Sequence, residues 1–208
     1  HRGDTFAGTP SLVVVRYIVS RAATRGLARV PGPRQLAVHD VSCAFLHADA
    51  DEEIYLVFPP HFCSPEYVGL MLKAMYGTRR AGLLWGEKIF EDLLPYGAQR
   101  GKGCGNLYFH VEKDLTGVVH GDDFFTEGPA ASLDWFDEVL DKCFVCKRRG
   151  RAGPGAGGGD AVEFLHRQVR FVPDRGFEYA VDEKHVRRLV EMLGMEGCGP
   201  APTPMVSG

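Results

Sequence analysis

The stretch VVHGDDFF, Val118–Phe125, decides the fold because two adjacent carboxylates, Asp122 and Asp123, stand inside an apolar sequence. The apolar flanks predict two short strands, and Gly121 supplies the backbone freedom of a tight turn between them. Side chains of a regular strand alternate between faces, so two neighbouring acids approach one point only at such a turn. Burying ionised carboxylates is costly without compensation, and a divalent cation is the usual compensation. A solvated β-turn is the alternative interpretation of this stretch.

A third acid occurs earlier in the chain. Asp40 closes the segment QLAVHD, an expected strand, and a short helix is expected after it in VSCAFLH. If this strand and the hairpin share a sheet, Asp40 faces Asp122 and Asp123. Three carboxylates can hold two metal ions about 4 Å apart, an arrangement suited to in-line phosphoryl transfer. We therefore expect Asp40, Asp122 and Asp123 to be catalytic residues and ligands of two Mg²⁺ (or Mn²⁺) ions.

Composition indicates an ordinary globular chain of 208 residues, with 45% hydrophobic and 25% charged residues. No apolar run approaches the roughly 18–20 residues that span a bilayer, so no membrane partner is expected. The chain starts on HRGD, without Met or a signal peptide, and we expect it to be part of something longer. A net charge of −3 gives no global nucleic-acid signature. Positive charge is concentrated in three clusters, which are Arg79-Arg80, Lys147-Arg148-Arg149 with Arg151, and Lys184 with Arg187-Arg188. The simplest interpretation of each cluster is a solvated face.

Hydrophobic periodicity predicts an α+β domain with an antiparallel sheet. A helix is expected with Thr9 as its cap, Pro10 at its first position and Gly26 as its stop, and further helices are expected over 81–94, 131–144 and 182–195. Strands are expected at 35–40, 52–58, 106–112 and in both arms of 116–128, with a second hairpin formed by 161–171 and 176–181. The Gly-rich segment RGRAGPGAGGGD, residues 149–160, is expected to be a flexible spacer.

Several segments together resemble the reverse transcriptase of copia-type LTR retrotransposons. They are DVSCAFLHADADEEIYLVFPPHF, LKAMYGTRRAGLLW, VVHGDDFF, EFLHRQVRF, DEKHVRRLVEMLGM and the closing PAPTPM, in the family's order. The resemblance extends from TFAGTP to TPM. It implies a reverse-transcriptase-like palm with an antiparallel sheet and packed helices. It also implies this division of the chain: partial fingers at 1–35 and 63–73, palm at 36–62 and 74–172, and the start of a thumb at 173–208.

The resemblance also implies an activity, namely RNA-directed DNA polymerase acting by two-metal nucleotidyl transfer. Asp40 would be the first palm aspartate, and Asp122 with Asp123 would be the hairpin pair. Phe45 matches the aromatic gate that crowds a 2′-hydroxyl and so selects deoxynucleotides. Arg80 could contact template or triphosphate. The main-chain amides expected to face the triphosphate are those of Val41, Ser42, Cys43 and Ala44.

The same resemblance implies partners and a setting. An RNA template, a DNA primer and a deoxynucleoside triphosphate would be the substrates. The rest of a pol polyprotein, with integrase and RNase H, would accompany this segment. The expected location is intracellular, in a cytoplasmic virus-like particle or the nucleus.

Some positions depart from the family pattern. His120-Gly121 precedes the acid pair where the family has Tyr-Val, and Gly82 and Leu83 stand where Pro and Arg are usual. His166 replaces the Gly of the usual FLG. The basic fingers hairpin expected upstream is missing from this sequence. A degenerate, non-catalytic remnant that at most binds nucleic acid is therefore an alternative. A viral RNA-dependent RNA polymerase is a third, disfavoured by Phe45 and the copia-like flanks.

Overall fold

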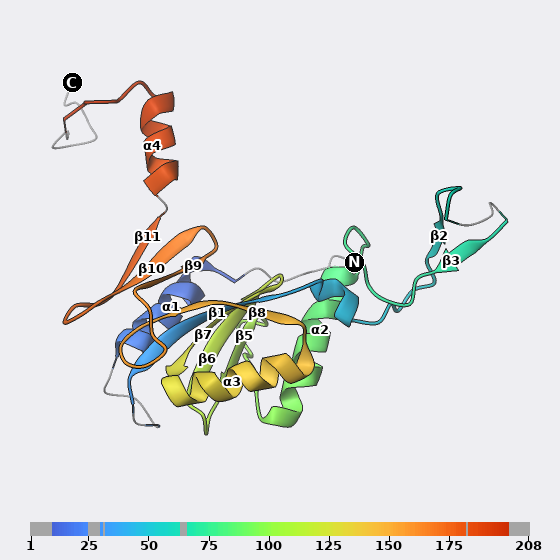
Figure 1. Ribbon diagram of the computed structural model, residues 1–208, viewed down its shortest axis with the longest axis horizontal. Coiled ribbons are helices and arrows are strands. Elements are labelled where there is room, and N and C mark those ends of the chain that lie inside the picture. Colours follow the sequence, from blue (N-terminus) through green and yellow to red (C-terminus); the bar gives the residue numbers. More distant parts are fainter. Residues whose placement is uncertain (1–9, 25–29, 31, 63–65, 182, 200–208) are drawn as a thin grey trace.

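The computed structural model describes residues 10–24, 30, 32–62, 66–181 and 183–199. Its centre is a six-stranded antiparallel sheet with the strand order β4-β5-β6-β7-β1-β8 (Figure 1). The strands are β1 (Arg34–Val41), β4 (Gln99–Arg100), β5 (Leu107–His110), β6 (Leu115–His120), β7 (Asp123–Pro129) and β8 (Cys146–Ala152). Helices pack on this sheet, so the predicted α+β class with an antiparallel sheet is confirmed.

Two amphipathic helices, α2 (Ala81–Leu93) and α3 (Ala130–Cys143), cover one face of the sheet (Figure 1). Their apolar stripes were predicted from residues spaced three and four apart. Trp85 of α2 and Phe136 of α3 are only 2% and 3% exposed. They join one core with sheet residues that include Ala37 and Phe124. The short 3₁₀ helix η4 (Leu94–Tyr96) continues α2.

Helix α1 (Leu12–Ala23) packs on the other face of the sheet. Val15 and Ile18 of α1 are fully buried there, in the same core as Val38 and Phe125. The helix begins at Leu12, with Ser11 as N-cap, and not at Pro10 as predicted. The expected cap Thr9 and stop Gly26 lie outside the described residues.

A second sheet of three strands shares this face and contains β9 (Ala161–Phe164), β10 (Arg167–Val172) and β11 (Gly176–Val181). The hairpin across residues 173–175 is as predicted. Residues 161–171, however, do not form the single expected strand. Leu165 and His166 have φ angles of 52° and 56°, so the chain reverses there and β9 pairs antiparallel with β10.

The predicted flexible spacer at 149–160 is wrong in its first part. Arg149–Ala152 belongs to β8, which pairs antiparallel with β1 along its length. The backbone groups of β1 would otherwise lack partners on that side, and this tertiary pairing overrides the weak strand propensity of a Gly- and Arg-rich sequence.

An ionic cluster connects α1 to the end of the sheet farthest from the acidic turn. Arg34 of β1 lies between Glu127 and Asp114, with ion pairs of 2.6 and 2.7 Å. Arg21 of α1 contacts the same two carboxylates, at 2.5 and 2.8 Å. Each buried charge therefore has an opposite partner, as a buried ion requires.

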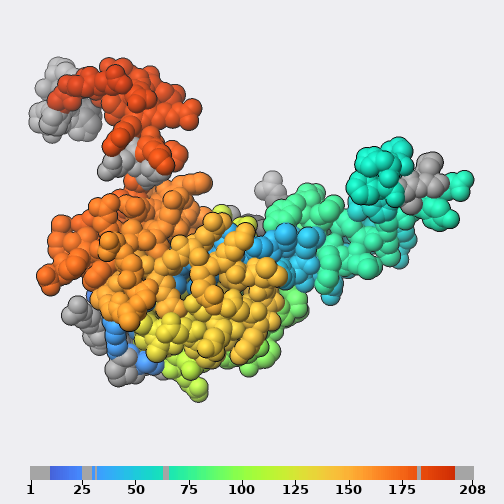
Figure 2. Space-filling model, viewed as in Figure 1, coloured from blue at the N-terminus to red at the C-terminus, as the bar shows by residue number. Residues whose placement is uncertain are grey.

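Two elements project from this body (Figure 1; Figure 2). One is the hairpin of β2 (Tyr55–Val57) and β3 (Val68–Leu70), where β2 is shorter than the expected strand at 52–58. The other is α4 (Glu183–Met192), within the range predicted for the last helix. Their exposed apolar side chains include Val57, Tyr67, Leu189 and Met192. Across the described residues, the helices are too short or too polar to span a bilayer.

Candidate active site

The acidic hairpin forms as predicted, with a two-residue turn between β6 and β7. His120 is paired with Asp123, which leaves Gly121 and Asp122 at the turn. Gly121 has a φ angle of +61°, a left-handed conformation that favours glycine. The turn therefore exposes Asp122 and leaves Asp123 half-buried at the start of β7.

Strand β1 brings the third acid to this turn. Asp40 is paired with Asp123 in the antiparallel register of β1 and β7. Directly opposed residues of neighbouring strands point to the same face, with Cα atoms about 4.5–5.5 Å apart. The Val41 amide also donates a hydrogen bond to the Asp122 carbonyl, at 2.9 Å. The sheet thus brings all three predicted acids to one end, with Asp40 and Asp123 on the face opposite α2 and α3.

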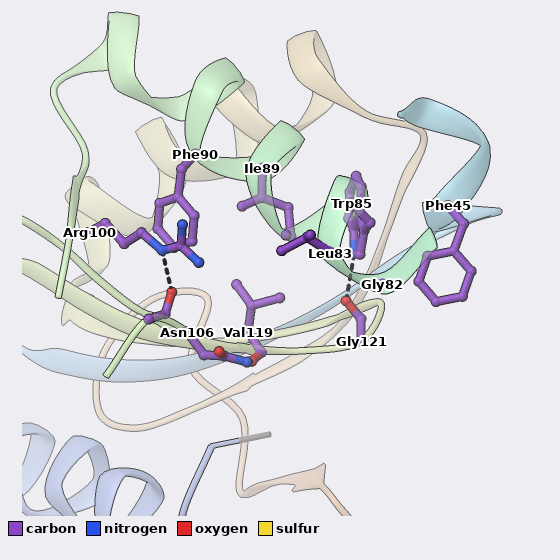
Figure 3. Close-up of a pocket in the computed structure, with 12 residues that line it drawn as sticks. Phe45, Gly82, Leu83, Trp85, Ile89, Phe90, Arg100, Asn106, Val119 and Gly121 are labelled. Carbon is purple, nitrogen blue, oxygen red and sulfur yellow. Dashed lines mark hydrogen bonds between the residues drawn. The ribbon is translucent and has the colours of Figure 1, made fainter. Parts of the chain in front are cut away.

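Helix α2 supports the turn from the buried side. Trp85 Nε1 donates a hydrogen bond to the Gly121 carbonyl at 2.7 Å (Figure 3). The Trp85 ring is itself held by an edge contact with Phe144, with centroids 5.1 Å apart. Beside this contact lies an apolar cavity of about 90 Å³, lined in part by Phe45, Ile89 and Gly121. Sequence reasoning placed Trp85 in the core but missed this hydrogen bond to the turn.

The three carboxylates influence one another. Burial, followed by the negative charges of Asp122 and Asp40, raises the pKa of Asp123 above its ordinary value. The positive charge of Arg149 acts in the opposite direction. Like charges that destabilise one another create a site where a cation is stabilising.

Arg149 of β8 is a residue that sequence reasoning assigned to a solvated cluster. Its Nη2 donates to Asp40 Oδ2, so this charge lies within the acidic site. The other arginines of the cluster, Arg148 and Arg151, contact Asp137 of α3 at 2.8 and 3.0 Å. The predicted solvated face is therefore exposed at Lys147, Arg148 and Arg149, but its arginines are also in ion pairs. The mixture of Gly and Arg in this segment gave no signal of it.

The residues present fit a divalent cation by their chemistry, since carboxylate oxygens are the ligands that Mg²⁺ prefers. Burial and the neighbouring charges, which raise the pKa of Asp123, point the same way. Within the described part of the chain, no group of three or more His, Cys, Asp and Glu side chains has the geometry of a formed metal site. Asp40 is paired with Arg149 in this conformation.

A cleft of about 610 Å³ opens beside the acids, between the main sheet and the β9–β10 turn. Asp123, His120 and Arg149 line it from the main sheet, and Glu163 and His166 line it from the turn. The cleft leaves open space next to Asp123. Neither its size nor the role of the β9–β10 turn was predicted.

The predicted nucleotide-binding amides are only partly available. Val41 donates to Asp122, as described above, and the Ser42 amide donates to the Val145 carbonyl at 2.8 Å. Cys43 has a left-handed φ of 53° and precedes the 3₁₀ helix η3 (Ala44–His47), the predicted short helix. Of the four expected amides, those of Val41 and Ser42 therefore bond to backbone carbonyls, and the amide of Ala44 hydrogen-bonds to the Tyr76 hydroxyl.

Phe45 and Arg80 lie in different surroundings. Phe45 of η3 is half-buried, and its ring lies against Tyr76 with centroids 4.4 Å apart. Partial burial and then the charge of Asp122 raise the pKa of Tyr76, which places this unpredicted residue near the acids. Arg80, at the start of α2, is in an ion pair with Asp51 at 2.9 Å.

Residues 25–207 match the family model described as "Reverse transcriptase (RNA-dependent DNA polymerase)". The putative transposon Ty5-1 protein of Saccharomyces cerevisiae is 35% identical over 118 residues, which are 54% of this chain and 38% of that protein. The truncated transposon Ty1-A Gag-Pol polyprotein of the same yeast is 38% identical over 66 residues, which are 32% of this chain. The chain spans 5% of that polyprotein.

Proposed function

The chain belongs to the reverse transcriptase (RNA-dependent DNA polymerase) family of Ty1/copia-type retrotransposons, and we propose that Asp40, Asp122 and Asp123 are its nucleotidyl-transfer site. The observation that carries the proposal is the pairing of Asp40 with Asp123 beside the Asp122 turn. These acids come from distant parts of the chain, yet they meet at one end of one sheet.

In this proposal the protein acts mainly by position and charge. When bound, two Mg²⁺ (or Mn²⁺) ions would activate the primer 3′-hydroxyl and neutralise the leaving pyrophosphate. Asp40, Asp122 and Asp123 would hold them. The hydrogen bonds from Trp85 and Val41 to the turn keep these carboxylates in place from two sides.

The substrates proposed are an RNA template, a DNA primer and a deoxynucleoside triphosphate. The cleft beside Asp123 would take the primer end. Phe45 would lie under the incoming sugar, supported by its contact with Tyr76. The amide of Cys43 would face the triphosphate, and the amide of Ala44 would have to leave the Tyr76 hydroxyl to do so. Arg80 would have to leave Asp51 to reach the triphosphate or the template.

The proposed domain assignment is a palm made of the main sheet with α2 and α3, with partial fingers and the start of a thumb around it. The paired strands β2 and β3 cross the boundary expected at residue 62, so we assign that hairpin to the fingers as a unit. The thumb would begin in the β10–β11 hairpin and include α4. The proposed setting is an intracellular pol polyprotein that also carries integrase and RNase H.

A second candidate is a non-catalytic remnant that at most binds nucleic acid. The ion pair of Arg149 with Asp40 favours it, because a permanent partner would keep Asp40 from a metal. Metal binding and catalysis separate the two candidates, since a remnant would show neither at these acids.

Primer extension on an RNA template tests the proposal, with the chain placed in a longer segment of its own reading frame. We expect extension with deoxynucleotides, and its loss in Asp40→Ala and in Asp123→Ala. Phe45→Ala should keep extension but admit ribonucleotides, because it removes only the crowding at the 2′ position. Unchanged extension in Asp40→Ala would overturn the assignment of the site. For the 208 residues alone we expect little extension.

A further inference from the structure

The pairing between β1 and β8 contains one irregular step, and Arg149 lies in it. Val38 is paired with Gly150, and the next residue, His39, is paired with Arg148, so the register passes over Arg149. Such an extra residue is a β-bulge, and bulges beside functional sites re-aim a side chain. Gly150 accommodates the bulge with a φ angle of +132°, which residues with side chains rarely adopt.

The bulge decides which arginines of β8 share a face of the sheet. In an unbroken strand, residues 148 and 151 would point to opposite faces. Here Arg148 and Arg151 both contact Asp137 of α3. Arg149 points to the other face, where it donates to Asp40. The irregular step therefore turns Arg151 to α3, beside Arg148, and leaves Arg149 as the arginine of β8 on the face of the acids, where Lys147 is opposed to Asp40.

The Arg149 side chain can leave Asp40 without disturbing the core. It is 58% exposed, whereas the Asp40 side chain is only 13% exposed. Arg149 also lines the cleft of about 610 Å³, so the space next to it can receive a released guanidinium. An ion pair with one partner this exposed adds little to stability. The ion pair between Arg149 and Asp40 therefore contributes little to holding β8 in place.

We propose that Arg149 is a resident counter-ion of the acidic site that competes with divalent cations for Asp40 and thereby sets the affinity of the site for them. This inference rests on the proposed function, because it takes Asp40 as a metal ligand. A guanidinium carries one positive charge and offers a carboxylate only hydrogen-bond donors. A divalent cation brings two charges and can contact Asp40 and Asp123 together, so its binding would release Arg149 into the cleft.

Manganese binding to the 208-residue chain tests the competition without any need for catalysis. Free Mn²⁺ is measured by electron paramagnetic resonance during titration of the protein. Arg149→Leu should raise the affinity by up to about fivefold, the range expected for losing a partly exposed competing charge. Arg149→Lys keeps a cation and should stay close to the parent protein. Arg148→Leu, which removes a charge from the same strand but the opposite face, should leave the affinity unchanged.

The inference and the proposed function fail in different ways. If Asp40→Asn weakens Mn²⁺ binding but Arg149→Leu has the affinity of the parent, only the inference is overturned. If Asp40→Asn itself has no effect, the proposed site is wrong. The double variant gives a further check, because Arg149→Leu should raise the affinity less once Asp40→Asn is present, when only the longer-range charge of Arg149 on Asp123 is removed. An equal gain in affinity in both backgrounds would mean that Arg149 acts elsewhere.

Discussion

Trp85 of α2 donates its indole N–H to the carbonyl of Gly121, at 2.7 Å, and so ties a core helix to the turn that carries two acids. A buried side chain thereby fixes an exposed loop. The acids gain a rigid support that does not contact a ligand itself, as precise functional sites require.

Replacing Trp85 tests this support. Trp85→Phe keeps most of the ring packing but removes the donor to Gly121, and it should lower the free energy of unfolding by about 1 kcal/mol more than a matched control. The control is Trp135→Phe, because Trp135 lies on α3 against His110, with ring centroids 5.1 Å apart. Urea unfolding of both variants measures the difference. Equal losses would show that the hydrogen bond to the turn contributes nothing.

Replacement of glycine by alanine should have opposite effects on stability at two positions. A Cβ atom on Gly117 of β6 would lie 2.2 Å from the Tyr108 ring, whereas one on Gly86 of α2 meets nothing within 4 Å. Tyr108 is only 1% exposed and cannot move aside freely. Gly117→Ala should destabilise the protein by about 1–3 kcal/mol, and Gly86→Ala should stabilise it by up to about 1 kcal/mol. Thermal unfolding that gives both changes the same sign would contradict the packing described here.

The environment of the Asp137 carboxyl in α3 predicts that the stability of the protein depends on pH. Burial raises the pKa of its carboxyl, but the hydrogen bond from His39 and the charges of Arg151 and Arg148 outweigh this, so the pKa lies below its ordinary value. A lowered carboxyl pKa means that the stabilisation is present above the unfolded-state pKa of about 3.9 and is lost as the pH falls through the folded-state pKa.

The corresponding variant is Asp137→Asn. At pH 7 it should cost about 1–3 kcal/mol, because several donors lose a charged partner, and the cost should shrink as the pH falls below about 4. Asp134→Asn is the matched control. The Asp134 side chain is 70% exposed and forms an ion pair with Arg151, so its loss should cost under about 1 kcal/mol. Unfolding curves at several pH values measure the loss of stability in each of the two variants. A cost for Asp137→Asn that does not depend on pH would remove the electrostatic explanation.

The environment of Asp123 predicts that its replacement by Asn stabilises the fold. Burial and the neighbouring charges of Asp122 and Asp40 disfavour its ionised form, as its raised pKa shows. Asp123→Asn should therefore raise the stability at pH 7, in the presence of a chelator, by about 0.2–1 kcal/mol. Exposed Asp122 provides the control, and Asp122→Asn should have a smaller effect. A loss of stability in Asp123→Asn would argue that the carboxylate has favourable partners in the apo protein.

The sequence predicted the parts of the site that depend on local pattern. The apolar flanks and Gly121 indicated the hairpin, and the acid at the end of an apolar strand indicated that Asp40 would join it. The bulge at Arg149 was not predictable, because Gly- and Arg-rich β8 has no alternating pattern and pairs only through its tertiary partner β1. The reversal at Leu165 and His166 was missed because neither residue favours the left-handed conformation it adopts.

The central claim is that Asp40 and Asp122 act together as one divalent-cation site, and Mn²⁺ titration of single variants tests it most directly. Asp40→Asn and Asp122→Asn should each weaken Mn²⁺ binding by about tenfold or more, because each removes a charged ligand from the same ions. Asp174→Asn, a change in the separate turn between β10 and β11, should bind Mn²⁺ like the parent protein. Equal affinity in the parent, Asp40→Asn and Asp122→Asn would contradict the account.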